Sequence, residues 1–290
     1  MIIIALFSLA FYASTQQASV HVANTPEFNQ QSWMEFVPNQ AEYVGYVNYQ
    51  QVAVLSGNAS LLGSNAILRV PQLNVSIHPY DVMYEVDIEL ASIQFNGTVS
   101  VLSLTQRQLG TISIALRSLN ASTIRSPLSY DGFSIYSLLI QRFGENKMIL
   151  GYLSLADNAL ILSYDRATGM QNVETILDQI SSNTSDLFDN ATLRNALLVT
   201  DPAQNGVAFF VGMFPTEFAG SNFIAKSVTY EDSSVIATRG FLFPNQDLAS
   251  DSLAEAQQIY NGASCTTAGP WLIITQTYTI NRLPTELSGI

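Results

Sequence analysis

Three carboxylates at alternating positions are the residues of this chain best suited to chemistry. Glu85, Asp87 and Glu89 lie within the run Asp81 to Leu90, and strand geometry would put them on one face about 7 Å apart. Like charges at that spacing repel, so a divalent cation ligated by their oxygens could offset the repulsion. The same residues could supply the carboxylate pair of a glycoside hydrolase. We favour a simpler interpretation, a solvated strand face, because a strand does not wrap around an ion as a loop does.

Other catalytic chemistry has little support. The two histidines are His21, in a polar segment, and His78, which precedes Pro79 without metal-ligand spacing around it. The chain contains no Walker loop, GxGxxG motif or nucleophile elbow. Cys265 is the sole cysteine, which excludes an intramolecular disulfide and suggests a small core residue. We therefore predict no catalytic residue, no cofactor and no enzymatic activity.

The segment that carries the carboxylates has the clearest strand pattern in the chain. Its even-numbered residues are apolar and alternate with the acids, which predicts one buried face and one wet face. The residues expected in the core are Val82, Tyr84, Val86, Ile88 and Leu90.

The rest of the chain predicts hairpins interrupted by a few helices. Strands are expected at 43–49, 97–104, 111–116, 133–139, 148–155, 160–164, 207–213, 223–230, 235–243 and 271–280. Period-3.6 patterns predict helices from Met170 to Ile180 and from Leu193 to Val199, the second capped by Asn190. Asn48 is expected to cap a short helix that ends by Gly57, and Ser252 with Glu255 forms a possible capping box. Without regular βαβ alternation, the fold class is α+β, an antiparallel sheet built of hairpins with a few packed helices.

Composition indicates where such a chain would work. Asp and Glu number 23 against 11 Lys and Arg, a net charge of −12, which argues against nucleic-acid binding because that needs clustered cations. Charged residues make up 12%, half the usual share of about 25%. Uncharged polar residues must keep the surface hydrated, which suits a chain outside the cell, including one in acid.

The N-terminal run Met1 to Ala13 is almost wholly apolar. It is too short to span a bilayer core of about 30 Å, since thirteen helical residues cover about 20 Å. We interpret residues 1–17 as a leader or membrane anchor, although the first Lys or Arg is Arg69 and a leader normally begins with a cation; a buried strand is the alternative. Residues 18–40 then form a polar linker, and 41–290 an α+β ectodomain that could divide into two sub-domains near 125–145.

Six Asn-X-Ser/Thr sequons support export, because such sequons accept glycans on secreted proteins. We predict that their asparagines lie on exposed turns or strand edges. They are Asn58, Asn74, Asn96, Asn120, Asn183 and Asn190.

Several segments together resemble a known family. They are Phe36 to Asn48 (FVPNQAEYVGYVN), Tyr130 to Tyr136 (YDGFSIY), Asp157 to Ser163 (DNALILS) and Leu187 to Leu197. Their order resembles an exported surface-protein family of bacteria and archaea that is defined as a domain of unknown function. The resemblance covers about two thirds of the chain and implies an exported, membrane-tethered α+β protein of unknown activity.

These observations predict a non-enzymatic, glycosylated cell-surface protein with a structural or binding role. Its expected partners are cell-envelope components or other copies of itself, with membrane contact through Met1 to Ala13 if that run is retained. One alternative is a subunit of an extracellular filament or sheath that uses the run for assembly. Another is an extracellular hydrolase using carboxylates.

Overall fold

The computed structural model describes residues 32–56, 66–91, 96–119, 127–142, 147–156, 158–182, 190–200, 206–214, 216–231 and 233–288. Its strands are β1 (Ala41–Asn48), β2 (Leu68–Val70), β3 (Val75–Ile77), β4 (Val82–Ala91), β5 (Asn96–Leu104), β6 (Leu128–Tyr130), β7 (Phe133–Arg142), β8 (Ile149–Ala156), β9 (Ala159–Ser163), β10 (Gly206–Met213), β11 (Phe223–Glu231), β12 (Ser234–Leu242), β13 (Ser264–Ala268) and β14 (Trp271–Thr279). The α-helices are α2 (Tyr49–Ser56), α3 (Gln106–Arg117), α4 (Gly169–Ser182), α5 (Ala191–Thr200), α6 (Gln246–Asp251), α7 (Leu253–Ile259) and α8 (Leu283–Ser288). Short 3₁₀ turns are η2 (Ser32–Phe36), η4 (Pro71–Leu73), η5 (Pro79–Asp81) and η7 (Ile280–Arg282).

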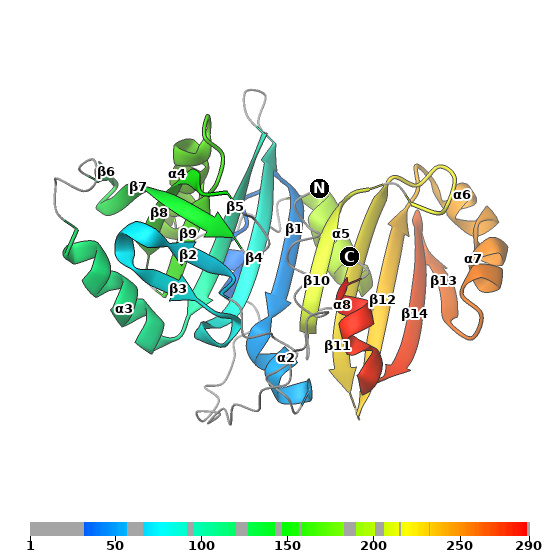
Figure 1. Ribbon diagram of the computed structural model, residues 1–290. Helices are drawn as coiled ribbons and strands as arrows, with labels where there is room; N and C mark the ends of the chain where they lie inside the picture. Colours follow the sequence, from blue (N-terminus) through cyan, green and yellow to red (C-terminus); the bar gives the residue numbers. More distant parts are fainter. Residues whose placement is uncertain are drawn as a thin grey trace.

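The described strands form one antiparallel sheet in the order β13-β14-β12-β11-β10-β1-β4-β5-β9-β8-β7-β2-β3, with β6 paired to β7 (Figure 1). This arrangement confirms the α+β class. The sheet continues through the region of the expected sub-domain boundary near 125–145, where β7 lies between β8 and β2.

Helices and short segments cover both faces of the sheet. On the first face, η2, α4 and α5 pack over residues such as Val86 and Val101. On the second face, α2, α3, α8 and the β2–β3 hairpin pack over residues such as Leu102 and Leu160. The helices α6 and α7 extend the second face with a smaller core around Phe241 and Ile274. The sheet is therefore a central layer with apolar side chains buried on both sides.

Several local predictions are confirmed. The backbone N–H of Gln51 donates to Asn48 Oδ1 at 2.9 Å, so Asn48 caps α2 as expected. Asn190 caps α5 in the same way, accepting from the Leu193 N–H at 3.1 Å. The hairpins β8–β9 and β11–β12 also lie where the sequence placed them.

Other predictions are wrong. Residues 111–116 belong to helix α3 and not to a strand; the helix buries Gln108, Ile112 and Leu116, which are spaced four apart. The capping box at Ser252 does not form, because the Ser252 hydroxyl donates to the Leu248 carbonyl instead. The end of the expected linker is also part of the folded body.

The end of the expected linker contains the η2 turn. In this turn Trp33 and Met34 are buried, and Trp33 stacks on Tyr46 with ring centroids 4.9 Å apart. The apolar run Met1 to Ala13 lies outside the described residues. Within the part of the chain that is described, no helix is both long enough and apolar enough to cross a membrane.

Candidate functional site: two buried ion clusters

The two faces of β4 are not what its alternation predicts. Val82, Tyr84, Val86, Ile88 and Leu90 are buried, as expected. However, Glu85 and Asp87 are buried too, with exposed fractions of 5% and 6%, and of the three acids Glu89 alone is exposed. The expectation of a solvated carboxylate face is therefore wrong, because the second face of the sheet is covered as well.

Glu85 and Asp87 share one base, Arg142 at the end of β7. We call Glu85, Asp87 and Arg142 the carboxylate-rich cluster. An Arg142 guanidinium nitrogen lies 3.5 Å from a Glu85 oxygen and 3.8 Å from an Asp87 oxygen, and the guanidinium sits over the Tyr164 ring at 4.8 Å from its centroid. This base takes the place of the divalent cation that the sequence suggested. No group of three metal-ligating side chains occurs among the described residues, so the candidate metal site at Glu85, Asp87 and Glu89 does not form.

Two hydroxyl groups complete this cluster. The Tyr49 hydroxyl of α2 donates to Glu85 at 2.7 Å, and the Ser100 hydroxyl of β5 donates to Asp87 through a short hydrogen bond. Burial, and then the nearby Asp87 charge, raise the pKa of Glu85 to about 8. At neutral pH Glu85 is therefore mostly protonated, and Arg142 balances the charge of Asp87.

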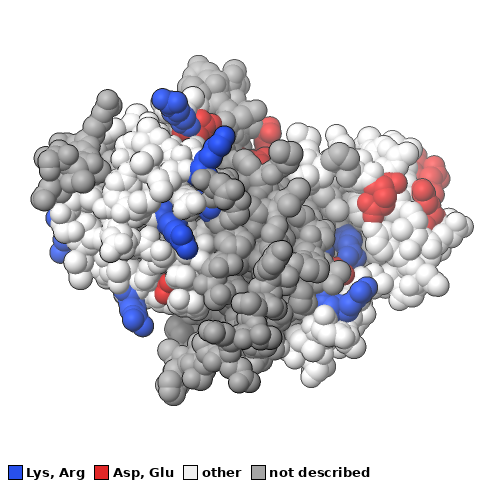
Figure 2. Space-filling model, in the orientation of Figure 1, with Lys and Arg blue, Asp and Glu red and all other residues white. Residues whose placement is uncertain are grey.

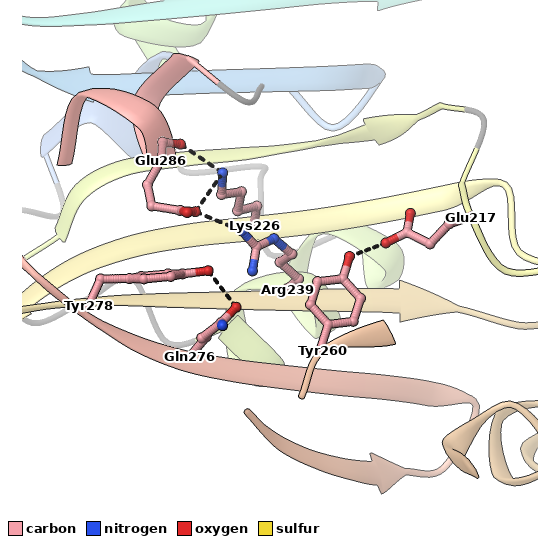
Figure 3. Close-up of polar contacts among 7 residues, drawn as sticks. All are labelled: Glu217, Lys226, Arg239, Tyr260, Gln276, Tyr278 and Glu286. Atoms are coloured by element: carbon pink, nitrogen blue, oxygen red, sulfur yellow. Dashed lines mark hydrogen bonds and ion pairs between the residues drawn. The ribbon is translucent and has the colours of Figure 1, made fainter. Parts of the chain in front are cut away.

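A second ion cluster lies on the same face, across β11 and β12. It consists of Lys226, Arg239 and Glu286, which we call the cation-rich cluster (Figure 3). Arg239 donates to the Glu286 carboxylate at 2.6 Å, and Lys226 Nζ lies 3.3 Å from the same carboxylate oxygen. Lys226 also donates to the Glu286 carbonyl oxygen at 2.7 Å, so these bonds tie helix α8 to the sheet.

Lys226 is 2% exposed and Glu286 is 5% exposed. Burial, and then repulsion by Arg239, lower the pKa of Lys226 to about 8. Sequence reasoning missed this cluster, although one of the chain's two lysines stands in the middle of the apolar strand Phe223 to Tyr230. That lysine was a usable signal. A lysine is rarely buried unless it has an acidic partner, so its place in an apolar strand indicates a buried ion pair.

The strand register places the two clusters in one row across the sheet. Asp87 lies beside Gly45, and Gly45 beside Phe210; Phe210 lies beside Lys226, and Lys226 beside Arg239. Three strand spacings of about 4.8 Å therefore separate Asp87 from Lys226 by about 14 Å. An aromatic group fills the interval.

In that interval the Tyr43 ring packs over Gly45, where an added Cβ would lie 3.0 Å from Tyr43 Cζ. Tyr43 and Phe210 are each 6% exposed, and both pack edge-on against Phe214. The clusters are thus separate polar islands in an otherwise apolar layer.

The predicted glycosylation sites Asn74 and Asn190 differ in exposure and in hydrogen bonding. Asn74 is exposed at the turn between β2 and β3, with a left-handed φ of 50°. Asn190 is half-buried, and its side-chain nitrogen, the atom that would carry a glycan, donates to the Asn39 carbonyl at 3.0 Å. Asn58, Asn120 and Asn183 lie outside the described residues, as does the side chain of Asn96.

The structure describes the surroundings of His78 and Cys265. His78 caps the η5 turn and stacks on Tyr80 with centroids 5.0 Å apart. Cys265 lies on β13, half-buried against the core around Phe241. His78 and Cys265 therefore both pack against neighbouring side chains.

Comparison with known proteins gives no family. No family model matches the chain, and no curated protein matches it. Among solved structures, crystal forms I, IV and III of TP0453 are similar, with 10%, 10% and 11% identity. The alignments cover 88%, 88% and 89% of this chain and 96%, 96% and 98% of TP0453, with TM-scores of 0.49, 0.47 and 0.46. At these scores the likeness supports no inference about function.

Proposed function

We propose that this chain is a non-enzymatic, exported cell-surface protein with a structural or binding role. The observation that carries the proposal is the burial of Glu85 and Asp87, the carboxylates best suited to chemistry. Arg142 of β7, Tyr49 of α2 and Ser100 of β5 bond to them. A hydrolase would need such a pair to reach its substrate, so this burial disfavours the hydrolase alternative. In our proposal these acids serve to hold distant strands together.

The export part of the proposal rests on the leader-like run Met1 to Ala13, the low charge content and the sequons. Asn74 supports it further, because an exposed turn is accessible to glycosylation. The resemblance to exported bacterial and archaeal surface proteins remains part of this proposal. We expect Asn74 to carry a glycan more fully than Asn190, whose side-chain nitrogen is already used in a hydrogen bond.

Glycopeptide mass spectrometry and protease treatment of intact producing cells test the proposal. We expect a glycan at Asn74 that is lost in Asn74→Gln, and we expect external protease to cleave the protein before the cells lyse. An unglycosylated protein that survives protease treatment until lysis would contradict the export claim. Hydrolysis of glycosides by the pure protein, lost in Glu85→Gln, would contradict the non-enzymatic claim.

End-to-end self-association is a second candidate function, related to the filament alternative. One end of the described sheet carries exposed arginines beside a few exposed acids such as Asp131, whereas the other end carries exposed acids (Figure 2). Arg69 of β2 and Arg107 and Arg117 of α3 lie at one end. Asp247 and Asp251 of α6 and Glu255 of α7 lie at the other. Opposite ends of this kind favour head-to-tail contact between copies, which extends into an open filament if the rotation does not close.

Charge swaps test this second candidate. One variant carries Arg107→Glu with Arg117→Glu, and the other carries Asp251→Arg with Glu255→Arg. We expect the native chain to sediment as larger species at low salt than at high salt. Each variant alone should stay monomeric, while an equimolar mixture should assemble again. A native chain that is monomeric at low salt would exclude this assembly.

A further inference from the structure

We propose that the cation-rich cluster binds one small monovalent anion, of chloride size, at Nη1 of Arg239. This inference is independent of the proposed function and concerns a ligand site on the second face of the sheet.

The first argument is charge balance. Two bases, Lys226 and Arg239, converge on the single carboxylate of Glu286. Glu217 is exposed and accepts a short hydrogen bond from the hydroxyl of Tyr260, the ring that lies under the Arg239 guanidinium. Among the residues that the structure describes, one positive charge is therefore in surplus in a largely buried site, where an uncompensated charge is costly. A monovalent anion would cancel it.

The second argument is an unsatisfied donor. Arg239 Nη1 is buried and makes no hydrogen bond to any residue the structure describes, whereas Nη2 of the same guanidinium bonds to Glu286. A buried donor without a partner costs about 1–3 kcal/mol, and more for a charged group. In Figure 3 this nitrogen points away from Glu286, toward the side on which Gln276 and Tyr278 lie. The surplus charge and the unused donor thus belong to the same side chain.

The surroundings select the kind of anion. The Arg239 guanidinium lies over the Tyr260 ring, at 5.6 Å from its centroid, and the Tyr278 hydroxyl donates to Gln276 through a short hydrogen bond. A single unused nitrogen donor favours a compact monatomic ion over a branched oxyanion, which needs several donors. A monovalent anion would bring the net charge of the cluster from +1 to zero, whereas a divalent anion would leave a net charge of −1.

The anion should stabilise the fold through helix α8. Arg239 binds Glu286, and Leu283 and Leu287 of α8 are buried in the second-face core. An anion that binds the folded cluster and not the unfolded chain raises stability by mass action. The effect should saturate with concentration, unlike general salt screening.

The test is the melting temperature of the full chain in sodium chloride, sodium bromide and sodium gluconate at one fixed ionic strength. We expect chloride and bromide to raise Tm saturably by about 2 °C or more over gluconate. Lys226→Met removes the surplus charge with an apolar side chain of similar length, and should abolish the halide effect. Arg117→Gln, an exposed arginine on α3, should keep it. A native chain with equal Tm in chloride and gluconate would overturn the proposal.

A second measurement guards against a Lys226→Met variant that fails to fold. Anomalous diffraction from bromide-soaked crystals of the native chain should show a peak within hydrogen-bond distance of Arg239 Nη1. A peak elsewhere, or a peak there without any halide effect on Tm, would count as an adventitious ion and contradict the proposal.

Discussion

The carboxylate-rich and cation-rich clusters lie on the same face of the same sheet, yet their charge imbalances are opposite. The first has two acids for one base, Glu85 and Asp87 against Arg142. The second has two bases for one acid, Lys226 and Arg239 against Glu286. In each cluster burial and then the charge imbalance shift the pKa of one group toward its neutral form: the pKa of Glu85 is raised, and the pKa of Lys226 is lowered. Burial thus acts on whichever charge is in excess.

The clusters also differ in what they hold together. Glu85 and Asp87 are bonded by side chains from α2, β5 and β7, so the first cluster joins parts of the main sheet to a helix and a distant strand. The second fixes one short helix, α8, through two sheet residues. Damage to the first should destabilise the whole domain, and damage to the second should first release α8.

The largest expected effect follows from removing the base of the carboxylate-rich cluster. Arg142→Met leaves Asp87 charged and unpaired in a buried site, and we expect a loss of about 3–5 kcal/mol in the free energy of unfolding. Urea denaturation measures this loss. Arg117→Met, on the exposed face of α3, is the matched control and should cost about 0.5 kcal/mol or less. Equal losses from both would mean that Arg142 does not neutralise these acids.

A smaller loss is expected from Glu286→Gln. The substitution removes the carboxylate of the cation-rich cluster, but Lys226 can respond by losing its proton, so we expect about 2–3 kcal/mol. Hydrogen exchange should show faster exchange in 283–288 than in β11 and β12. Uniform acceleration across the sheet would contradict a local role for the bond between α8 and the sheet.

The two losses should add. The clusters are about 14 Å apart across the register, beyond the range at which substitutions usually couple. The double variant Arg142→Met with Glu286→Gln should therefore lose the sum of the single losses within about 0.5 kcal/mol. A large deviation would show that the clusters communicate through Tyr43 and Phe210.

The smallest effect is expected from Glu85→Gln at pH 4. Because Glu85 is mostly protonated there, glutamine replaces a neutral group and can still accept the Tyr49 hydrogen bond. We expect a change of about 1 kcal/mol or less in the free energy of unfolding at pH 4, where Glu85 is largely protonated in both the folded and the unfolded chain. A loss as large as that of Arg142→Met would show that Glu85 is ionised in the folded chain.

The sequence predicted most strands and helices because their periodicity is local. It failed at residues 111–116, where the β-branched residues Thr111, Ile112 and Ile114 imitate a strand; the four-residue spacing of Gln108, Ile112 and Leu116 identifies the helix. It also failed on the polar face of β4. Alternation shows which residues share a face, but not whether distant segments cover that face, and here α2 and β7 supply the cover.

The cation-rich cluster was harder to predict for the same reason. Glu286 is 60 residues from Lys226 along the chain and 47 from Arg239. No local pattern joins these positions, and the antiparallel pairing of β11 with β12 is what places the two bases side by side.

The opposite imbalance of the two clusters is tested most directly by the free energy of unfolding as a function of pH. The pKa of Glu85 is raised from 4.5 to about 8, so its stabilisation is full below pH 4.5 and is lost as pH rises toward 8. The pKa of Lys226 is lowered from 10.5 to about 8, so stability returns as pH rises from 8 toward 10.5. Each slope is at most about 1.4 kcal/mol per pH unit.

We therefore predict a minimum in stability near pH 8 for the native chain, measured by urea denaturation between pH 5 and 10. Glu85→Gln should flatten the acid side of this minimum, and Lys226→Met should flatten the alkaline side. A flat profile, a maximum near pH 8, or a profile that neither substitution alters would contradict the opposite charge imbalance of the two clusters.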